Sequence, residues 1–571
     1  MKNVINYILR SDGNEFAHTF KVKSISVLHS ANRISRAKLI LLDGDVSEQK
    51  FKLSDDDFFK PGKTLEIDVG FENDLNSIFT GVITRHSIRI NEDNNTSLEV
   101  ECKHKAVQLT LNLVNRFFYE QDDQEVVEEI LNNENIVFST SDWAGYVHSQ
   151  LVQFESTNWD FILARAAANG LLVFNEKDRI VIKAPDMDGE EVAQCEYGVN
   201  VLEFEAAMNN ELQIKKVERT AWSSEDQTVQ SVEGTASFEN TQGNLSTNDL
   251  ADAWGDRTSL QQHGGELIAE ELSAWSDAGA TQKELSKIEG RVRITGTHAV
   301  IPGKVITLTG FGERFSGRTL VTGVRHELQK GNWTTDVQFG ISSDAKSKNL
   351  MGMALARTLV PQVIGCQIGI VTQLEEDPES SFRVKVKLPI LNEQEEGIWA
   401  RIAQPYAGDS YGFCFYPEIG DEVVLGFLDD DPRNAIILGS LHSSGKPSPL
   451  DGADDNHIKG IHTRSGLILS WDDENKTIEI ATPSGNSVTL DESDQKITII
   501  DEHSNQIAMS SEGIVLESNK KVEIKASTDL SIEAVNIKLK ASGKFVAEGS
   551  GGADLKSSGI AVLKGSMVQI N

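Results

Sequence analysis

The sequence predicts a mainly β protein of several domains, whose C-terminal segment 446–571 forms an intertwined trimeric β-helix, or β-prism. Three observations indicate this fold class. The chain has 571 residues, apolar and polar residues alternate along much of it, and short strand-like segments recur at a short spacing near its end. At roughly 150 residues per domain, this length predicts about four domains.

Residues 1 to about 120 are rich in strand patterns. Apolar and polar residues alternate over Thr64–Val69 and again over Val82–Ile90. Two short helices are then expected, over Asp123–Asn132 and Asn158–Ala168. A glycine follows the second helix closely, as is typical of a helix C-cap.

The middle of the chain returns to strands after a polar stretch. Segments 171–174 and 179–183 predict a hairpin, whereas 224–264 is rich in Ser, Thr, Gln, Asn and Gly and predicts loops. A helix is expected over Ala278–Lys287. Further strands are expected over 290–295, 304–308, 318–324 and 334–339.

The C-terminal segment carries a repeat of apolar residues separated by one residue. The pairs are Ile478/Ile480, Val488/Leu490, Ile497/Ile499, Ile507/Met509, Ile514/Leu516, Val522/Ile524, Leu530/Ile532 and Ile537/Leu539. Their spacing settles to about seven or eight residues along the chain, whereas a single-chain β-helix needs roughly 20 per turn. One such set of strands cannot enclose a core, but three chains around one axis can.

A homotrimer is therefore predicted. Its needle core is expected to contain Val522, Ile524, Leu530, Ile532, Ile537 and Leu539. A single-chain β-helix and a flat meander are the alternatives to this arrangement.

Charge and cysteine usage narrow the class of function. The net charge of −33 repels nucleic acid, so no nucleic-acid partner is expected. The four cysteines (Cys102, Cys195, Cys366 and Cys414) form no CxxC pair and indicate free thiols. The N-terminus lacks the apolar stretch of a signal peptide, and no run of about 18 apolar residues is present. Synthesis in the cytoplasm without a signal peptide is expected.

Candidate catalytic and metal-binding patterns are weak. Gly408–Gly412 matches G-x-S-x-G, but that motif needs a following helix, and the β-favouring segment 413–417 follows here, which favours a turn. The acidic clusters at 375–378 and 429–432 could bind a divalent cation, but their prolines favour solvated turns. His326 is expected to pack or form a hydrogen bond. No catalytic residue, metal or cofactor is predicted.

Three motifs in the segment 360–445 carry a resemblance to a known family. They are Trp399–Pro405 (WARIAQP), Pro417–Val423 (PEIGDEV) and Gly439–Leu441 (GSL). This segment closely resembles the OB-fold of VgrG proteins and phage tail spikes. Residues 1–355 resemble the phage hub region of the same family through weaker cues in the same order, namely Pro61-Gly62, 79–82, 153–161, 301–303 and His326.

The resemblance implies a domain order and a mechanical function. The expected domains are a hub over 1–355, with two barrel-like domains at about 1–120 and 171–345, an OB-fold over 360–445 and the spike over 446–571. Such a chain is the structural central spike of a contractile injection system. Its trimer adapts a hexameric, Hcp-like inner tube to a three-fold needle that punctures the target envelope when the sheath contracts.

The family also implies partners at the needle end and in the baseplate. A PAAR-type tip protein is expected to dock on Ile560, Val562, Met567, Val568, Ile570 and Asn571. Baseplate components contact the hub, and effectors are possible cargo. The sequence leaves open whether the machine is a type VI secretion apparatus, an extracellular phage-like particle or a phage.

Two enzymatic alternatives are disfavoured by length. Some relatives insert a lysozyme domain between the OB-fold and the needle, but only about fifteen residues separate them here, and a domain needs at least about 50. Others carry a toxin after the needle, whereas this sequence stops at Asn571. The chain is therefore expected not to be an enzyme. A cell-wall hydrolase and a ligand-binding OB module remain as alternatives.

Overall fold

The computed structural model describes most of the chain. The described residues are 4–16, 21–72, 74–92, 95–211, 213–341, 355–356, 359–389 and 397–570. They divide into two compact units, Met1–His442 and Ser443–Asn571. Strands are the main regular element of the first unit and the only one in the described residues of the second, which confirms the mainly β fold class. Within these described ranges, every helix is too short or too polar to cross a bilayer.

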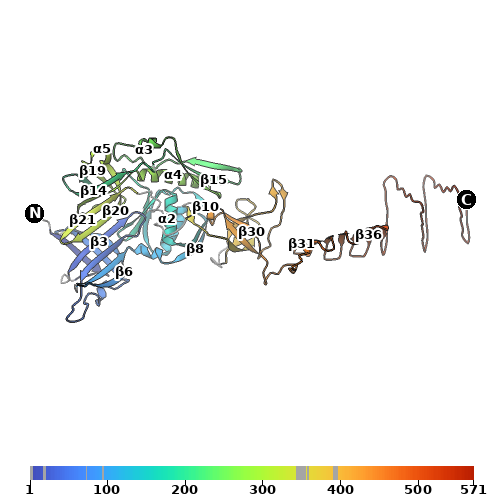
Figure 1. The fold of residues 1–571 in the computed structure, drawn as a ribbon, viewed down its shortest axis with the longest axis horizontal. Coiled ribbons are helices and arrows are strands. Elements are labelled where there is room, and N and C mark those ends of the chain that lie inside the picture. Colours follow the sequence, from blue (N-terminus) through green and yellow to red (C-terminus); the bar gives the residue numbers. More distant parts are fainter. Residues whose placement is uncertain are drawn as a thin grey trace. The chain divides into compact units, whose positions relative to one another are not determined.

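A 13-stranded sheet forms much of the first unit (Figure 1). The strands run in the order β14-β18-β21-β20-β3-β4-β7-β6-β5-β1-β2, and β13 joins β20 through β19. Their bounds are β1 Ile5–Ser11, β2 Asn14–Glu15, β3 Val22–Ser30, β4 Arg36–Leu42, β5 Thr64–Phe71, β6 Asp74–Ile90, β7 Thr96–Lys103, β13 Glu191–Glu196, β14 Val201–Met208, β18 Ile288–Thr295, β19 Val305–Thr309, β20 Gly317–Gln329 and β21 Asn332–Phe339.

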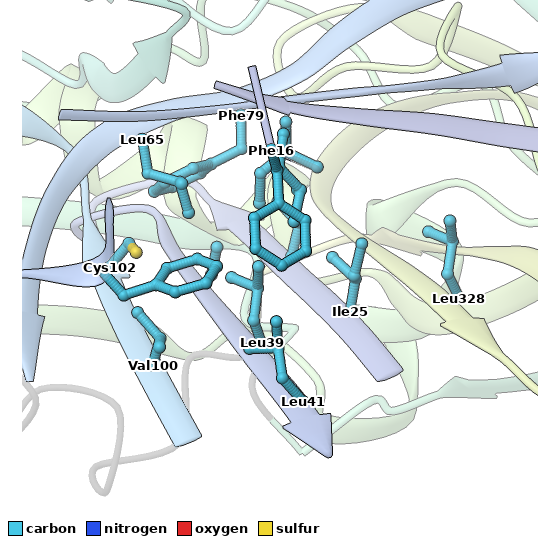
Figure 2. Close-up of a cluster of buried hydrophobic side chains, with 14 of the residues drawn as sticks. Phe16, Ile25, Leu39, Leu41, Leu65, Phe79, Val100, Cys102 and Leu328 are labelled. Carbon is cyan, nitrogen blue, oxygen red and sulfur yellow. The ribbon is translucent and has the colours of Figure 1, made fainter. Parts of the chain in front are cut away.

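Two hydrophobic cores lie on this sheet. Figure 2 shows the first, in which Leu39, Leu65 and Val100 gather with Leu328, a residue of β20. The second core contains residues of β18 to β21, such as Val337. Antiparallel pairing of β3 with β20 joins the strands of the two cores, so they share one continuous sheet.

Short helices and small sheets cover the rest of the first unit. The α-helices are α1 Asp123–Asn133, α2 Asn158–Ala168, α3 Thr247–Ala251, α4 Ala269–Leu285 and α5 Gly312–Phe315, and the 3₁₀ helices are η1 Asp57–Phe59, η2 Lys105–Thr110, η3 Asp252–Trp254 and η5 Leu428–Asp430. The additional strands are β8 Leu113–Asp122, β9 Val137–Thr140, β10 Val147–Thr157, β11 Leu172–Glu176, β12 Arg179–Lys183, β22 Leu355–Ala356 and β23 Val360–Pro361.

The helix caps explain where α1 and α2 begin. Asp122 and Glu125 form a capping box at α1, and the Thr157 side chain accepts the Asp160 backbone N–H at α2. Helix α4 has no such side-chain cap and begins nine residues before the expected Ala278. Buried tertiary packing of its first turns, including Trp275, specifies this helix instead of a local signal.

The loop prediction for 224–264 was wrong in part. Strands β15 Lys216–Ser223, β16 Thr228–Glu233 and β17 Thr258–His263 form a three-stranded sheet in the order β16-β15-β17. β17 pairs in parallel with β15, which lies more than thirty residues earlier in the chain. Because this pairing is long-range and β16 is mostly exposed and polar, the local composition does not reveal it.

A closed five-stranded barrel ends the first unit and confirms the expected OB-fold. Its order is β24-β25-β26-β30-β29, and a two-residue-strand hairpin, β27–β28, follows β26. The bounds are β24 Gln367–Gln373, β25 Val384–Lys387, β26 Ile398–Ile402, β27 Ala407–Gly408, β28 Tyr411–Gly412, β29 Glu422–Phe427 and β30 Ala435–Ser440. Val152 and Phe154 of β10 pack into its core, so the barrel and the preceding region form one compact unit.

The second unit begins with a seven-stranded antiparallel meander in which each strand pairs with the next (Figure 1). The strands are β31 Ile458–His462, β32 Ile468–Asp472, β33 Thr477–Ala481, β34 Ser487–Asp491, β35 Lys496–Ile500, β36 Gln506–Ser510 and β37 Gly513–Glu517. Residues 518–570, all of which are described, form no helix or strand. Within one chain, residues 458–517 therefore form a meander, which was one of the alternatives expected from the sequence. Each strand forms backbone hydrogen bonds with the next strand.

Candidate assembly interface

The meander of the second unit presents one continuous apolar face. In each five-residue strand the second and fourth side chains point to the same side, and these positions are apolar in most strands. Ile478 lies opposite Leu490, which lies opposite Ile497. We call the full set the apolar ladder. It comprises Ile461, Leu469, Trp471, Ile478, Ile480, Val488, Leu490, Ile497, Ile499, Ile507, Met509, Ile514 and Leu516.

The ladder is largely uncovered in a single chain. Ile480 is 54% exposed, Leu516 55% and Ile514 72%. Two shallow hollows run along it, one lined by Ile478 and Met509 and the other by Ile480 and its neighbours. Soluble monomers rarely leave so extended an apolar face in water, so this surface marks an interface.

The opposite face of the same sheet is mainly polar over β33 and β34. Thr477, Glu479, Thr489 and Asp491 occupy the first, third and fifth positions of their strands. A single-layer sheet of this kind needs a second layer on its apolar side to be stable in water. The apolar side of this sheet is therefore the candidate for burial against a second layer.

The needle-core residues expected from the sequence lie after the last strand. Within one chain they are not brought together, and each side chain is at least half exposed: Val522 50%, Ile524 63%, Leu530 60%, Ile532 65%, Ile537 53% and Leu539 71%. The expected tip-docking residues are also exposed, namely Ile560 87%, Val562 66%, Met567 84%, Val568 48% and Ile570 85%. Asn571 lies outside the described residues.

The candidate catalytic motif forms a hairpin turn, as the sequence favoured. Gly408–Gly412 spans β27 and β28, and the Ser410 hydroxyl donates to the neighbouring Asp409 carboxylate at 3.1 Å. The segment that follows leads to β29 and not to a helix. His326 forms a hydrogen bond through Nδ1 to the Thr335 hydroxyl at 3.1 Å, which confirms its structural interpretation.

The solvated-turn interpretation fits the first acidic cluster, where Glu375, Glu376 and Pro378 are exposed, but it was wrong for Asp431 in the second. The Arg383 guanidinium donates two hydrogen bonds to Asp377 Oδ1, at 2.6 and 3.0 Å, and both side chains are largely buried. Asp431 is fully buried and ion-paired. Both clusters have protein partners, and the described part of the chain holds no group of three or more metal-ligating side chains.

Asp431 belongs to a buried ion-pair network, which sequence reasoning missed. The Arg433 guanidinium donates to Asp431 at 2.8 Å and to both oxygens of Glu271 at 2.9 Å. Glu271 also accepts from Arg165 at 3.2 Å, and Arg165 donates to both oxygens of Asp123, at 2.6 and 2.8 Å. The network links α1, α2 and α4 to the connection between β29 and β30 of the OB barrel.

The electrostatics of the network favour its charged form. Burial alone would raise the pKa of Asp123 and of Asp431, but Arg165 and Arg433 respectively, helped by histidine hydrogen bonds, hold both pKa values well below the usual range. Burial likewise opposes the charge of Glu271, while Arg433 and Arg165 lower its pKa overall. The one sequence signal was Arg165, a charged residue in the otherwise apolar stretch of α2.

Fold and interface together define an assembly protein that carries a phage-baseplate type of barrel. Residues 367–442 match the type VI secretion system/phage-baseplate injector OB domain, and residues 1–330 match the Alg8 N-terminal domain. The match over residues 1–330 covers more than half of the chain. The chain therefore belongs to the Alg8 N-terminal domain family. VgrG spike proteins are among its relatives, which confirms the resemblance predicted from its sequence motifs.

The relatives match parts of the chain. The type VI secretion system spike protein VgrG1a of Pseudomonas aeruginosa is 26% identical over 202 residues, covering 33% of this chain and 31% of VgrG1a. VgrG3 of Vibrio cholerae is 36% identical over 96 residues, covering 16% of this chain and 9% of VgrG3. The chain thus aligns with less than a third of the length of these curated relatives.

A solved structure shares the fold over most of the chain. A chain of the Francisella PdpA–VgrG complex aligns with a TM-score of 0.52 and 8% sequence identity, over 90% of this chain and 80% of that chain. At this identity the similarity shows the common fold alone.

Proposed function

We propose that the chain is the structural central spike of a contractile injection system and works as a homotrimer. The apolar ladder is the observation that carries this proposal, because a folded chain leaves such a face uncovered only when another surface covers it. The relatives support the same assignment, since they are spike proteins of type VI secretion systems.

Three copies suit the ladder better than two. Strands such as β33 and β34 contribute two apolar residues each, so the apolar face is narrow. Three such faces can close a prism around one axis. Beyond Glu517, the needle-core residues Val522, Ile524, Leu530, Ile532, Ile537 and Leu539 would then be buried in the same way by winding of the three chains. Strand edges disappear in that arrangement, which protects the needle from aggregation.

In this proposal each segment of the chain has its own role. Residues 1–355 are the hub, which contacts a hexameric Hcp-like tube through two barrel-like halves per chain. Residues 360–445 are the OB-fold, and 446–571 form the spike. A PAAR-type tip protein docks on the exposed apolar residues at the C-terminal end, from Ile560 onward. Baseplate components are further partners.

The role is mechanical and not enzymatic. When a sheath contracts, force passes from the hub to the needle, and the OB barrel lies between them in the chain. The buried ion pairs of Glu271 with Arg433 and Arg165 support this role, because they fix the barrel to α2 and α4 of the hub. Removal of one partner would leave an unpaired buried charge, which opposes any opening of this junction.

Localisation on purified particles tests the proposal. Sheathed tubes are isolated from cells that produce the chain, and an antibody against residues of the OB-fold is imaged by electron microscopy. The proposal predicts label at one end of each tube. A chain absent from these particles, or distributed along the sheath, would contradict it.

A further inference from the structure

The buried ion-pair network lies where the OB barrel meets α1, α2 and α4, a contact that we call the junction. Its carboxylates belong to Asp123, Glu271 and Asp431, and its guanidinium groups belong to Arg165 and Arg433. Three negative and two positive charges leave a net charge of −1, in side chains that are at most 8% exposed. A buried charge without a partner is strongly unfavourable, so the network lacks one positive charge.

The charges of these five groups are fixed near neutral pH. Burial alone would raise the pKa of each carboxyl group, but the arginines hold all three pKa values below their usual range. Burial likewise opposes the charge of the arginines, yet the carboxylates raise the pKa of both. Tyr146 stays neutral, because burial raises its pKa. A proton that cancels the remaining charge therefore binds to one of the two histidines of the network, His148 and His263.

His263, at the end of β17, lies in a site that suits both of its protonation states. Its Nε2 lies 3.1 Å from Asp431 Oδ2, and its Nδ1 lies 3.1 Å from the amide nitrogen and 3.2 Å from the carbonyl oxygen of Gly265. The neutral ring donates to Asp431 and accepts the Gly265 N–H, whereas the charged ring donates to Asp431 and to the Gly265 carbonyl. Both ring nitrogens therefore have partners in either state.

His148 is less suited to carry the charge. Its Nε2 lies 3.1 Å from Asp123 Oδ1, but it also lies 3.3 Å from the guanidinium nitrogen Nη2 of Arg165. The positive charge of Arg165 opposes a second positive charge on the adjacent ring. The geometry of the network therefore favours His263 as the group that gains the proton.

Most of the other charged groups on the elements that meet here are acidic. They are Glu266 in the turn after β17, Asp429 and Asp430 in the connection from β29 to β30, Glu270 on α4, and Asp122 and Glu125 at the start of α1. Among the basic residues, Arg219 of β15 lies two residues from the partner of His263 in the strand register. Its guanidinium donates to the carbonyl oxygens of Glu218 and Ser259, at 3.0 and 3.2 Å. Because these contacts direct it towards the other end of β17, Arg219 does not supply the missing charge.

We propose that the junction binds one proton at His263 and that this proton tightens the contact between the OB barrel and the elements before it. The turn after β17 also holds the barrel through its backbone, since Gly264 donates to Asp429 at 2.8 Å and Glu266 donates to the Asn434 side chain at 3.0 Å. Opening of these contacts exposes the carboxylates to water, where their charge needs no partner. Closure of the junction and proton binding therefore favour each other, for any number of chains in the assembly.

A lower pH is expected to strengthen the junction. A histidine in water titrates near pH 6.5, so the stabilisation is complete below about that pH and is lost as the pH rises above it. Hydrogen exchange of the full-length protein measures the opening locally, in peptides that cover 259–266 and 427–436. After correction for intrinsic exchange rates, we expect the protection of these peptides at a pH of about 6 to exceed that at about 8.5 by at least about fivefold.

Two matched variants assign the proton. His263→Gln keeps a donor for Asp431 but cannot be charged, so its two protection values should agree within about twofold. His148→Gln changes the other histidine of the same network and should keep the wild-type ratio. Equal protection of the wild type at both pH values, or a fivefold ratio that persists in His263→Gln, would overturn the proposal.

Asp431→Asn replaces His263→Gln if that variant fails to fold. It leaves two carboxylates and two arginines in the network, so the net charge is zero and the proton is no longer needed. The protection ratio should then disappear in the same way, and a ratio like that of the wild type would contradict the proposal. The position of the chain on sheathed tubes is a separate measurement, so failure of this inference leaves the proposed function intact.

Discussion

At the residue scale, the buried ion-pair network explains how the first unit holds its parts together. Asp123, Glu271 and Asp431 lie far apart in the sequence, and two arginines join them through side chains that are at most 8% exposed. Replacement of a whole buried ion-pair network by apolar residues can leave the folding stability unchanged. Removal of one partner lowers the stability, because it leaves a buried charge unpaired. The network therefore makes the junction of hub and barrel sensitive to single substitutions.

Arg433→Met tests this sensitivity. The variant leaves Glu271 and Asp431 without their shared partner, and we expect a loss of about 3–5 kcal/mol in unfolding free energy. The measurement is the first unfolding transition in urea. Arg89→Met is the control, because the Arg89 side chain is 76% exposed and lies 3.8 Å from the Glu99 carboxylate. This variant should lower the unfolding free energy by less than about 1 kcal/mol. If both variants lower the unfolding free energy equally, the buried network contributes no more stability than an exposed ion pair.

Three histidines of the first unit, two of them fully buried, predict a pH dependence. Burial lowers the pKa of His326 to about 3 and that of His104 to about 4, and it also lowers the pKa of His29. The pKa in the unfolded chain is about 6.5. Because the folded pKa is the lower one, their stability contribution is complete above pH 6.5 and is lost as pH falls towards the folded values.

His326→Gln separates this contribution from that of other groups. The free energy of unfolding of the wild type should fall between pH 6.5 and 4, and the variant should fall less steeply, by up to about 1.4 kcal/mol per pH unit. Unfolding in urea at several pH values gives both slopes. His503→Gln, at a side chain that is 72% exposed, should keep the wild-type slope. Identical slopes for wild type and His326→Gln would refute the assignment.

At the element scale, five-residue strands form the proposed assembly surface, and β32 to β37 each contribute two apolar positions to it. The period of two places Leu490 on the ladder and its neighbour Thr489 on the polar face. The two residues therefore provide a matched pair of positions on one strand, one inside the proposed interface and one outside it.

Leu490→Asp and Thr489→Asp exploit this pair. In a three-fold assembly, Leu490→Asp places three carboxylates around one axis in an apolar interior, which is very unfavourable. We expect it to abolish the trimer at micromolar concentration, as judged by native mass, whereas Thr489→Asp should leave the trimer intact. A Leu490→Asp protein that remains trimeric would exclude the ladder from the interface.

Local sequence patterns predicted the bounds of helices and strands better than they predicted which strands pair. Helix α2 and strand β12 have the expected bounds because caps and alternation are encoded within a few residues. The pairing of β17 with β15 and the first turns of α4 were missed, because tertiary contacts specify them. The positions of the apolar pairs of the ladder followed from the sequence for the same local reason.

At the scale of the whole molecule, the sequence was least informative where distant residues meet. The ion-pair network draws on positions between 123 and 433, and no local pattern links them. Similarly, the continuous 13-stranded sheet depends on the β3–β20 pairing across nearly 300 residues. The OB barrel was predictable because its motifs lie in one segment, where they resemble a known family.

In the proposed trimer three chains share one needle, and the mass of the purified full-length protein under native conditions tests this arrangement. We expect a species of three times 62.7 kDa that resists dissociation in mild denaturant, because wound chains separate only by unfolding. A monodisperse protein of 62.7 kDa at micromolar concentration would contradict it.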